Sequence, residues 1–160
     1  MIILGIDPGI ADTGYGVIKA AGQTCAAIAH GTIQTPANTP LPDRLKTLYD
    51  DLTQLISLHK PDAIAVEELF FAKNTKTAIT VSHARGIILL AAKNAECAVR
   101  EFTPLQIKQA LVGYGRADKN QVQQMVKILL HLDTIPKPDD AADGLAIALC
   151  AAQTKKELSD

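Results

Sequence analysis

Short apolar runs alternate with polar and glycine-rich stretches along the chain, and each run predicts one element. Residues 1–7 form a continuous run rich in isoleucine, which is typical of a strand buried on both faces. Residues 8–14 are rich in turn-forming residues and predict a connection. Residues 15–21 and 24–35 then predict two further strands, joined by a hairpin turn at Gly22-Gln23.

A helix and a second type of strand pairing follow. Leucine and isoleucine recur at helical spacing over residues 41–58, which predicts an amphipathic helix that Pro61 ends. Residues 63–66 form another short apolar run, and Glu67 and Glu68 follow it. Because a strand, a helix and a strand occur in this order, we expect a right-handed crossover between two parallel strands.

The second half of the chain predicts mainly helices. We expect a helix over residues 74–92 and a strand over residues 97–102. Glycine inside a helix costs about 1 kcal/mol relative to alanine, so Gly86 indicates a close contact with another helix.

Three further helices have recognisable ends. The first begins with the cap Thr103-Pro104 and stops at Gly113, and the second begins with a capping box at Asp118 and Gln121. The third begins near Pro138, and its apolar side should contain Leu145, Leu149 and Ala152.

Composition restricts the class of protein. With 160 residues, of which 48% are hydrophobic and 21% charged, the chain predicts one α/β domain over residues 1–155 and a short tail over 156–160. Its longest apolar stretch, residues 144–152, is far shorter than the roughly 20 residues of a membrane helix. The N-terminus lacks a basic segment, and the three cysteines stand far apart. We therefore expect a cytoplasmic protein, with the cysteines buried and reduced.

The charges are unevenly distributed. Residues 1–72 contain 4 basic and 8 acidic side chains, and residues 128–160 contain 3 basic and 6 acidic ones. Residues 73–127 between them contain 9 basic and 3 acidic side chains. A basic middle segment suits a polyanionic partner, although charge alone is equally typical of a solvated surface.

Four acidic residues suggest chemistry. Asp7 and Glu67 end two predicted central strands, and ligands of α/β sheets bind outside the carboxyl ends of strands. Asp140 and Asp143 lie three residues apart, and so on one face of the last helix. Carboxylates gathered in a partly dry crevice repel one another unless a cation lies between them. Together these acids predict a Mg²⁺ or Mn²⁺ site, in which two ions roughly 4 Å apart could hydrolyse a phosphodiester.

Each acid also has an ordinary structural explanation. Asp7 could cap the turn that follows it, and Glu67 and Glu68 could be exposed charges at a strand end. Acids at the start of the last helix, including Asp139, could simply satisfy its dipole. The metal-site hypothesis is favoured because all four acids would supply hard oxygen ligands around one crevice.

The motifs around these acids resemble those of the RuvC family of Holliday junction resolvases. The matching segments are Gly5-Ile6-Asp7-Pro8-Gly9, Thr13-Gly14-Tyr15-Gly16, Ala65-Val66-Glu67 followed by Phe70, and Asp140-Ala141-Ala142-Asp143. The resemblance extends from Ile3 to about Ala151. It implies a ribonuclease-H-like three-layer fold, in which helices flank a central mixed five-stranded sheet.

The resemblance also implies the activity and the assembly. The family consists of metal-dependent endonucleases that make paired symmetric nicks in four-way DNA junctions during recombination and repair. It implies two Mg²⁺ ions per site, with Mn²⁺ as a substitute, a homodimer, and partnership with the branch-migration proteins RuvA and RuvB. Gly86 fits a helix-to-helix contact of that dimer.

The resemblance implies a role for each residue that matches a functional position of the family. Asp7, Glu67, Asp140 and Asp143 match the catalytic acids that hold the metal, while Glu68 and Asp139 are neighbours that leave the register open. The predicted DNA-binding residues are Lys108 and Lys119 near the scissile phosphate, Phe70 as an aromatic intruding at the crossover, Lys73, and Arg116 on the DNA backbone.

Three other functions compete with this hypothesis. Sugar-kinase and actin-like ATPases also open with an Asp-x-Gly turn, but they need two such domains, and this chain provides one. A ribonuclease of the same fold would cut RNA–DNA hybrids. A junction-binding protein without catalysis would not need all four acids.

Overall fold

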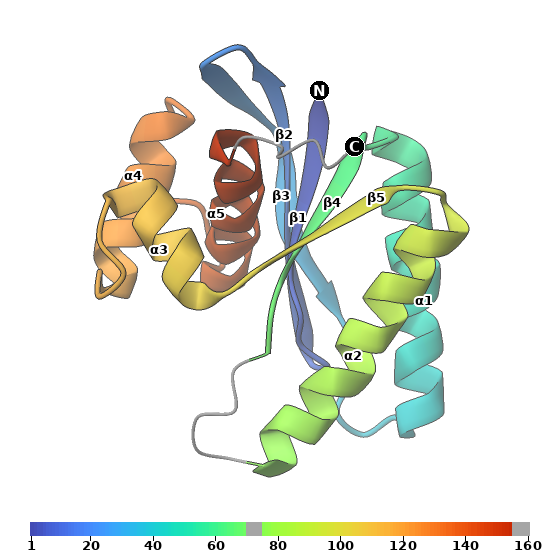
Figure 1. Ribbon diagram of the computed structural model, residues 1–160. Helices are drawn as coiled ribbons and strands as arrows, with labels where there is room; N and C mark the ends of the chain where they lie inside the picture. The colour runs from blue at the N-terminus through green and yellow to red at the C-terminus, as the bar shows by residue number, and fades with distance from the viewer. Residues whose placement is uncertain (70–74, 155–160) are drawn as a thin grey trace, which may run out of the picture.

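The computed structural model describes residues 1–69 and 75–154, and within them one sheet lies between two groups of helices (Figure 1). The strands are β1 (Ile2–Asp7), β2 (Asp12–Ala21), β3 (Thr24–Gln34), β4 (Ala63–Glu67) and β5 (Ala98–Phe102). The helices are α1 (Leu41–His59), α2 (Thr75–Asn94), α3 (Pro104–Val112), α4 (Lys119–Leu129) and α5 (Asp139–Gln153).

The five strands form one mixed sheet in the order β3-β2-β1-β4-β5. β1, β2 and β3 pair antiparallel, as the predicted hairpin requires, whereas β1 pairs with β4 and β4 with β5 in parallel. The predicted parallel crossover through α1 is therefore confirmed. β1 lies at the centre, so its carboxyl end and that of β4 are neighbours.

The sheet separates two hydrophobic cores. Alternate residues of a strand point to opposite faces. Leu4 and Ile6 of β1 therefore pack against α1 and α2, whereas Ile3 packs against α3, α4 and α5. Figure 1 shows the resulting layers, with α5 between the sheet and the pair α3 and α4. This arrangement confirms the predicted three-layer fold.

Two helix starts follow their sequence signals closely. Thr103 caps α3 and Asp118 caps α4, each in a reciprocal capping box with the glutamine three residues later. α3 ends at Gly113, whose backbone is left-handed with φ of 82°. These caps fix the starts of two helices that carry basic residues toward the site.

Several predictions need correction. β2 begins at Asp12, inside the segment expected to be only a turn, because Asp7 already pairs with Gly14. α5 is buried on almost every side over residues 141–151, because helices cover its outer face, so the expectation of a single apolar side is too narrow.

Two cysteines also differ from expectation, while the helix contact expected at Gly86 stays a prediction for the dimer. A Cβ added at Gly86 would meet no atom of the described chain within 4 Å, so this glycine makes no close helix contact within one chain. Of the cysteines only Cys150 is buried. Cys25 on β3 and Cys97, just before β5, are half-buried. None of the helices in the described segments is long and apolar enough to cross a membrane.

Candidate metal-dependent active site

Strand register brings Asp7 and Glu67 together at one edge of the sheet. Ile6 of β1 pairs with Val66 of β4, so the next residue of each strand is the acid that ends it. Gly5 pairs with Ala65, and the alternation of side chains then places both acids on the face that α5 covers.

Glycines of the sheet allow α5 to lie directly on the backbone of β1 and β2. A Cβ on Gly5 would lie 2.2 Å from the carbonyl oxygen of Gly144, and one on Gly16 would lie 2.4 Å from the amide nitrogen of Leu145. A Cβ on Gly14, the partner of Asp7, would lie 2.0 Å from the carbonyl oxygen of Asp140. Without these side chains, the start of α5 reaches the end of β1.

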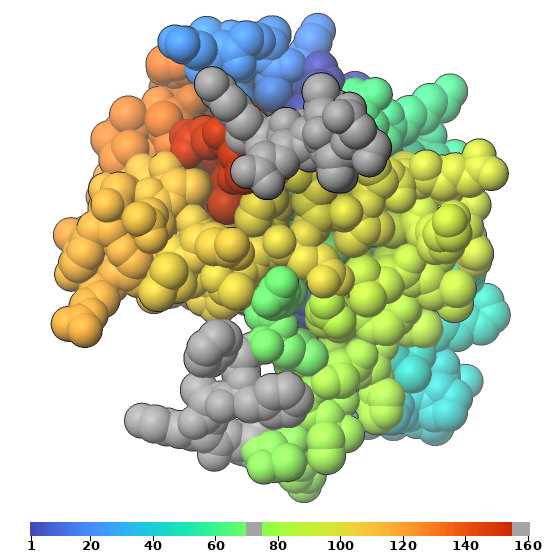
Figure 2. Space-filling view, viewed as in Figure 1, coloured from blue at the N-terminus to red at the C-terminus, as the bar shows by residue number. Residues whose placement is uncertain are grey.

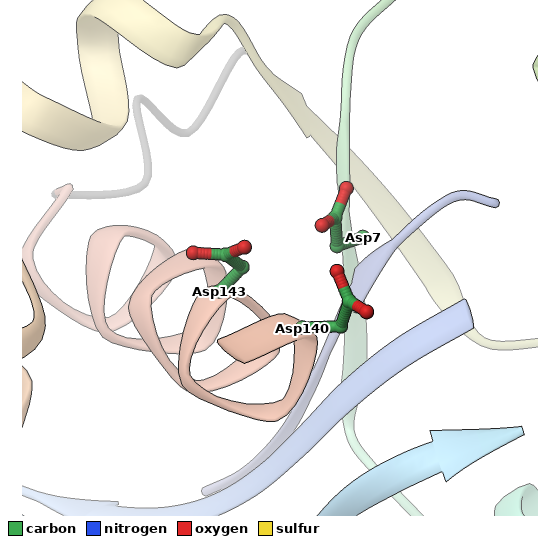
Figure 3. A group of neighbouring side chains, drawn as sticks. All are labelled: Asp7, Asp140 and Asp143. Atoms are coloured by element: carbon green, nitrogen blue, oxygen red, sulfur yellow. The ribbon is translucent and has the colours of Figure 1, made fainter. Parts of the chain in front are cut away.

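Three carboxylates meet where α5 and β1 come together. Asp7, Asp140 and Asp143 each offer one oxygen, and these oxygens lie within 4.8 Å of one another. Figure 3 shows the two acids of α5 around the space that Asp7 faces. A hydrogen bond joins the side chains of Asp7 and Glu67, so the fourth predicted acid adjoins this cluster.

A pocket of about 280 Å³ opens beside the acids. It is lined by Asp7, Glu67, Pro104, Ile107, Lys108, Lys119, Val122, Asp143, Ala146 and Ile147. Acids therefore come from β1, β4 and α5, and two lysines come from the starts of α3 and α4. The green end of β4 reaches the surface beside the yellow segment that leads into α3 (Figure 2).

Burial and mutual repulsion perturb the acids strongly. Burial, together with the charges of Glu67, Asp143 and Asp140, raises the pKa of Asp7 to about 8, and burial is the largest of these causes. Burial also raises the pKa of Glu67 and that of Asp143. The hydrogen bond between the two side chains raises the pKa of Asp7 and opposes the rise in the pKa of Glu67.

The donor set fits a hard divalent cation. Every candidate ligand is a half-buried carboxylate: Asp7, Glu67 and Asp143 line the pocket, and Asp140 joins Asp7 and Asp143 in the three-carboxylate cluster. Such a cation would offset both the burial and the mutual repulsion that raise the pKa of Asp7. Oxygen-only ligand sets favour Mg²⁺, Ca²⁺ or Mn²⁺ over softer metals.

The structure distinguishes the alternative acids by position. Glu68 does not line the pocket, and its backbone amide donates a hydrogen bond to the carbonyl of Phe102. Asp139 lies outside the three-carboxylate cluster and pairs with Lys137 and Lys119 instead. This geometry agrees with the register that names Glu67 and Asp140.

The predicted DNA-binding residues have three outcomes. Lys108 and Lys119 line the pocket, as expected for groups near the acids. Arg116 is exposed on the loop between α3 and α4 and does not line the pocket. Phe70 and Lys73 lie outside the described residues, so their roles stay predictions.

Sequence reasoning missed two features of the site. The first is the packing of α5 directly on the backbone of Gly5, Gly14 and Gly16. These glycines belong to the motifs of the sequence, but the motifs alone do not predict this contact. The signal was present, because glycines alternate at positions 14 and 16 of a strand, where they cost stability unless another backbone approaches. The second missed feature is the pair of acids that share Lys119.

Comparison with known proteins identifies relatives over nearly the full length. The family model described as Crossover junction endodeoxyribonuclease RuvC matches residues 3–151. The protein of that name from Alkaliphilus metalliredigens is 58% identical over 96% of this chain and 94% of the relative. That from Heliobacterium modesticaldum is 55% identical over 96% and 95%, respectively.

Solved structures agree with the sequence comparison. RuvC of Thermus thermophilus, solved in complex with a Holliday junction substrate, superposes with a TM-score of 0.90 and 36% identity. The match covers 95% of this chain and 93% of that one. The yeast mitochondrial Holliday junction resolvase Ydc2, at 17% identity and a TM-score of 0.66, shares the fold.

Proposed function

The chain belongs to the RuvC family of crossover junction endodeoxyribonucleases, and from this premise we propose that its four-acid cluster cuts four-way DNA junctions with the help of Mg²⁺. The observation that carries the proposal is the meeting of Asp7, Asp140 and Asp143, with Glu67 hydrogen-bonded to Asp7. The acids assemble from both halves of the chain at the carboxyl edge of the sheet, where α/β folds bind ligands.

Two ions fit the chemistry better than one. Asp7 on β1, Glu67 on β4, and Asp140 and Asp143 on α5 would hold them. When bound, such ions activate water and stabilise the leaving oxygen in phosphodiester hydrolysis. Mn²⁺, which accepts the same oxygen ligands, should substitute for Mg²⁺.

The lysines of the pocket supply fixed positive charge. Lys108 lines the pocket, and its charge opposes the rise in the pKa of Glu67, which supports a role beside the acid cluster. A phosphate that enters the pocket would contact Lys108 and Lys119, and both would stabilise the negative charge that develops as the bond breaks. We assign these lysines to the scissile phosphate and Arg116 to the DNA backbone beyond the pocket.

A nicking assay tests the proposal directly. Synthetic four-way junction, linear duplex of the same sequence and an RNA–DNA hybrid are incubated with the protein and Mg²⁺, Mn²⁺ or EDTA. Cleavage of the junction alone, abolished by EDTA, is the expected result. Preferred cutting of the hybrid would instead favour a ribonuclease, and binding without cutting in either metal would favour a structural junction protein.

Assembly as a homodimer is supported by one exposed face of α2. Ile79, His83, Gly86 and Leu90 follow helical spacing, and Ile79 and Leu90 are 55% and 51% exposed. A Cβ at Gly86 would meet no atom of residues 1–69 and 75–154 within 4 Å, which is compatible with a second copy packing on this face. A two-fold dimer would place one active site at each of two equivalent cuts.

The remaining parts of the proposal concern the cellular compartment and the role of Phe70 at the crossover. We assign the protein to the cytoplasm, where the branch-migration proteins RuvA and RuvB would present the junction. Phe70 follows the end of β4 by three residues in sequence, which suits a ring that inserts where base stacking is already broken. Phe70→Ala should lose activity on intact junctions and recover it on junctions with unpaired bases beside the cut.

A further inference from the structure

Lys119 lies between two carboxylates that belong to different surroundings. Its Nζ atom is 3.4 Å from Oδ2 of Asp143 and 3.6 Å from Oδ2 of Asp139. Asp143 belongs to the cluster that would bind metal, and its side chain is 31% exposed. Asp139 lies outside that cluster, and its side chain is 48% exposed.

Asp139 forms ion pairs with two lysines, Lys119 and Lys137. Neighbouring residues of an α-helix point about 100° apart, so Asp139 and Asp140 of the first turn of α5 face different directions. Oδ1 of Asp139 accepts a hydrogen bond of 2.8 Å from Lys137, and Oδ2 faces Lys119. The hydrogen bond with Lys137 and then that with Gln123 lower the pKa of Asp139 most, and the charges of Lys137 and Lys119 lower it as well.

The position of Lys119 in its helix is unfavourable without these partners. It is the first residue of α4, where the helix dipole disfavours positive charge. Partial burial lowers its pKa, but Asp143, Asp139 and Asp140 together raise it above the ordinary value. The lysine is therefore held by the acids of α5, while the capping box at Asp118 anchors its backbone.

An ammonium beside Asp143 and a divalent cation bound by Asp143 would repel each other. Mg²⁺ coordinates carboxylate oxygens at about 2.0–2.1 Å, so the two positive charges would share one small carboxylate. Because Nζ already lies within ion-pair distance of Asp139, the end of the lysine can leave Asp143 and keep Asp139 by side-chain rotation while α4 stays fixed.

We propose that Lys119 is a displaceable counter-cation of the metal site, which neutralises Asp143 before the metal binds and passes to Asp139 when it arrives. This inference rests on the metal site proposed above. Asp139 is then a positioning residue: it takes up the lysine, lowers the free energy of the metal-bound state, and keeps the lysine beside the pocket where the phosphate enters.

Mg²⁺ binding to the DNA-free protein, measured by titration calorimetry, tests the proposal without reference to cleavage. Four proteins are compared: wild type, Asp139→Asn, Lys119→Met and the double variant. We expect Lys119→Met to raise the Mg²⁺ affinity about threefold or more and Asp139→Asn to lower it about threefold, a modest change because exposed ion pairs are weak. In the Lys119→Met background, Asp139→Asn should have no effect.

The double variant separates the proposal from simple charge effects. If Asp139→Asn lowers the affinity equally with and without Lys119, Asp139 acts on the metal through its own charge, and the proposal is overturned. An unchanged affinity in Lys119→Met would overturn it as well. A melting curve in EDTA first shows that each of the four proteins is folded. If none of the folded proteins then binds Mg²⁺, the metal site itself is refuted.

Two further variants serve as controls. Lys137→Met removes a lysine from the same carboxylate without removing one from Asp143, so its Mg²⁺ affinity should stay within about twofold of wild type. Asp139→Glu retains the acceptor and should keep the wild-type affinity. A threefold gain in Lys137→Met would mean that any nearby positive charge has the effect of Lys119, which contradicts the proposal.

Discussion

Two adjacent glutamates at the end of β4 have different surroundings in the structure. Glu67 hydrogen-bonds to Asp7 and lines the pocket, whereas Glu68 lies beside β5 and reaches it through its backbone. Glu67→Gln and Asp7→Asn should therefore reduce junction cleavage by at least about a hundredfold, since each removes a charged metal ligand, with junction binding nearly unchanged. Glu68→Gln should stay active.

Rates of junction nicking in Mg²⁺, and binding measured in Ca²⁺ or EDTA, check this prediction. Glu68→Gln is the matched control, because it changes the same chemical group one residue away. An inactive Glu68 variant beside an active Glu67 variant would reverse the assignment of the two acids.

The raised pKa of Asp7 makes metal binding depend on pH. Its pKa is about 8 in the metal-free protein, so at pH 7 the carboxyl is mainly protonated and must lose its proton when a cation binds. Mg²⁺ affinity should therefore rise between pH 6 and pH 8, and each site should release about one proton below pH 8 and few above it.

Calorimetric titrations in two buffers of different ionisation enthalpy measure this proton release. Linkage sets the sign for stability too: an acid whose pKa rises on folding favours the folded state at low pH, so the metal-free protein should lose stability from about pH 4 to pH 8. Asp7→Asn lacks this group, and its metal-free stability should vary less with pH. Equal proton release by wild type and this variant would exclude Asp7 as the source.

At the scale of elements, the seat of α5 on the sheet determines whether the acids meet. In Gly16→Ala the new methyl group would lie 2.4 Å from the amide nitrogen and 2.6 Å from the Cα of Leu145, both backbone atoms that cannot rotate away. We expect the free energy of unfolding to fall by about 1–3 kcal/mol. The Mg²⁺ affinity should fall as well, because Asp140 and Asp143 would move away from Asp7.

Urea unfolding at low protein concentration and calorimetric Mg²⁺ titration provide the two measurements. Gly86→Ala is the control, because its methyl group meets open space within the chain, and alanine favours a helix interior by up to about 1 kcal/mol. Wild-type stability in Gly16→Ala would show that α5 can shift outward without loss.

The same elements show why the sequence predicts the strands and helices better than the site. Caps at Thr103 and Asp118 and the apolar runs of β1 and β4 are local signals, so the elements and their parallel or antiparallel pairing follow from them. The approach of α5 to glycine backbones depends on contacts distant in sequence. The four acids were found through local motifs, whereas the sharing of Lys119 between Asp139 and Asp143 depends on how α4 packs on α5.

At the scale of the whole molecule, binding to junction DNA should depend on phosphate contacts from the basic middle segment. Residues 73–127 contain 9 of the 16 basic side chains, and the release of counterions makes such binding weaken as salt rises. Arg116 is exposed near the start of α4, so Arg116→Ala should reduce the slope of log affinity against log salt by about one unit.

Fluorescence anisotropy of a labelled junction at several salt concentrations measures the slope. Lys19→Ala is the control, since Lys19 is exposed on β2 outside the basic segment and should leave the slope unchanged. An affinity that stays constant between low and physiological salt would contradict the phosphate-contact hypothesis for the whole surface.

The last prediction concerns the pairing of two copies through α2. Leu90 is 51% exposed on the face that contains Gly86, whereas Leu58 is 74% exposed at the end of α1. If the α2 face joins the dimer, a buried unpaired charge there costs several kcal/mol, so Leu90→Glu should dissociate it at micromolar concentration. Leu58→Glu adds the same charge at an even more exposed leucine and should leave the dimer intact.

Sedimentation velocity measures the dimer, and a junction carried on a supercoiled plasmid measures paired cutting, because two coordinated nicks linearise it and one nick only relaxes it. The Leu90→Glu chain should retain Mg²⁺ binding, since its four acids belong to one copy, yet should yield relaxed circles in place of linear product. A monomeric variant that still linearises the plasmid at the wild-type rate would show that two cuts do not require two joined copies. Dissociation by Leu58→Glu instead would move the interface from α2 to α1.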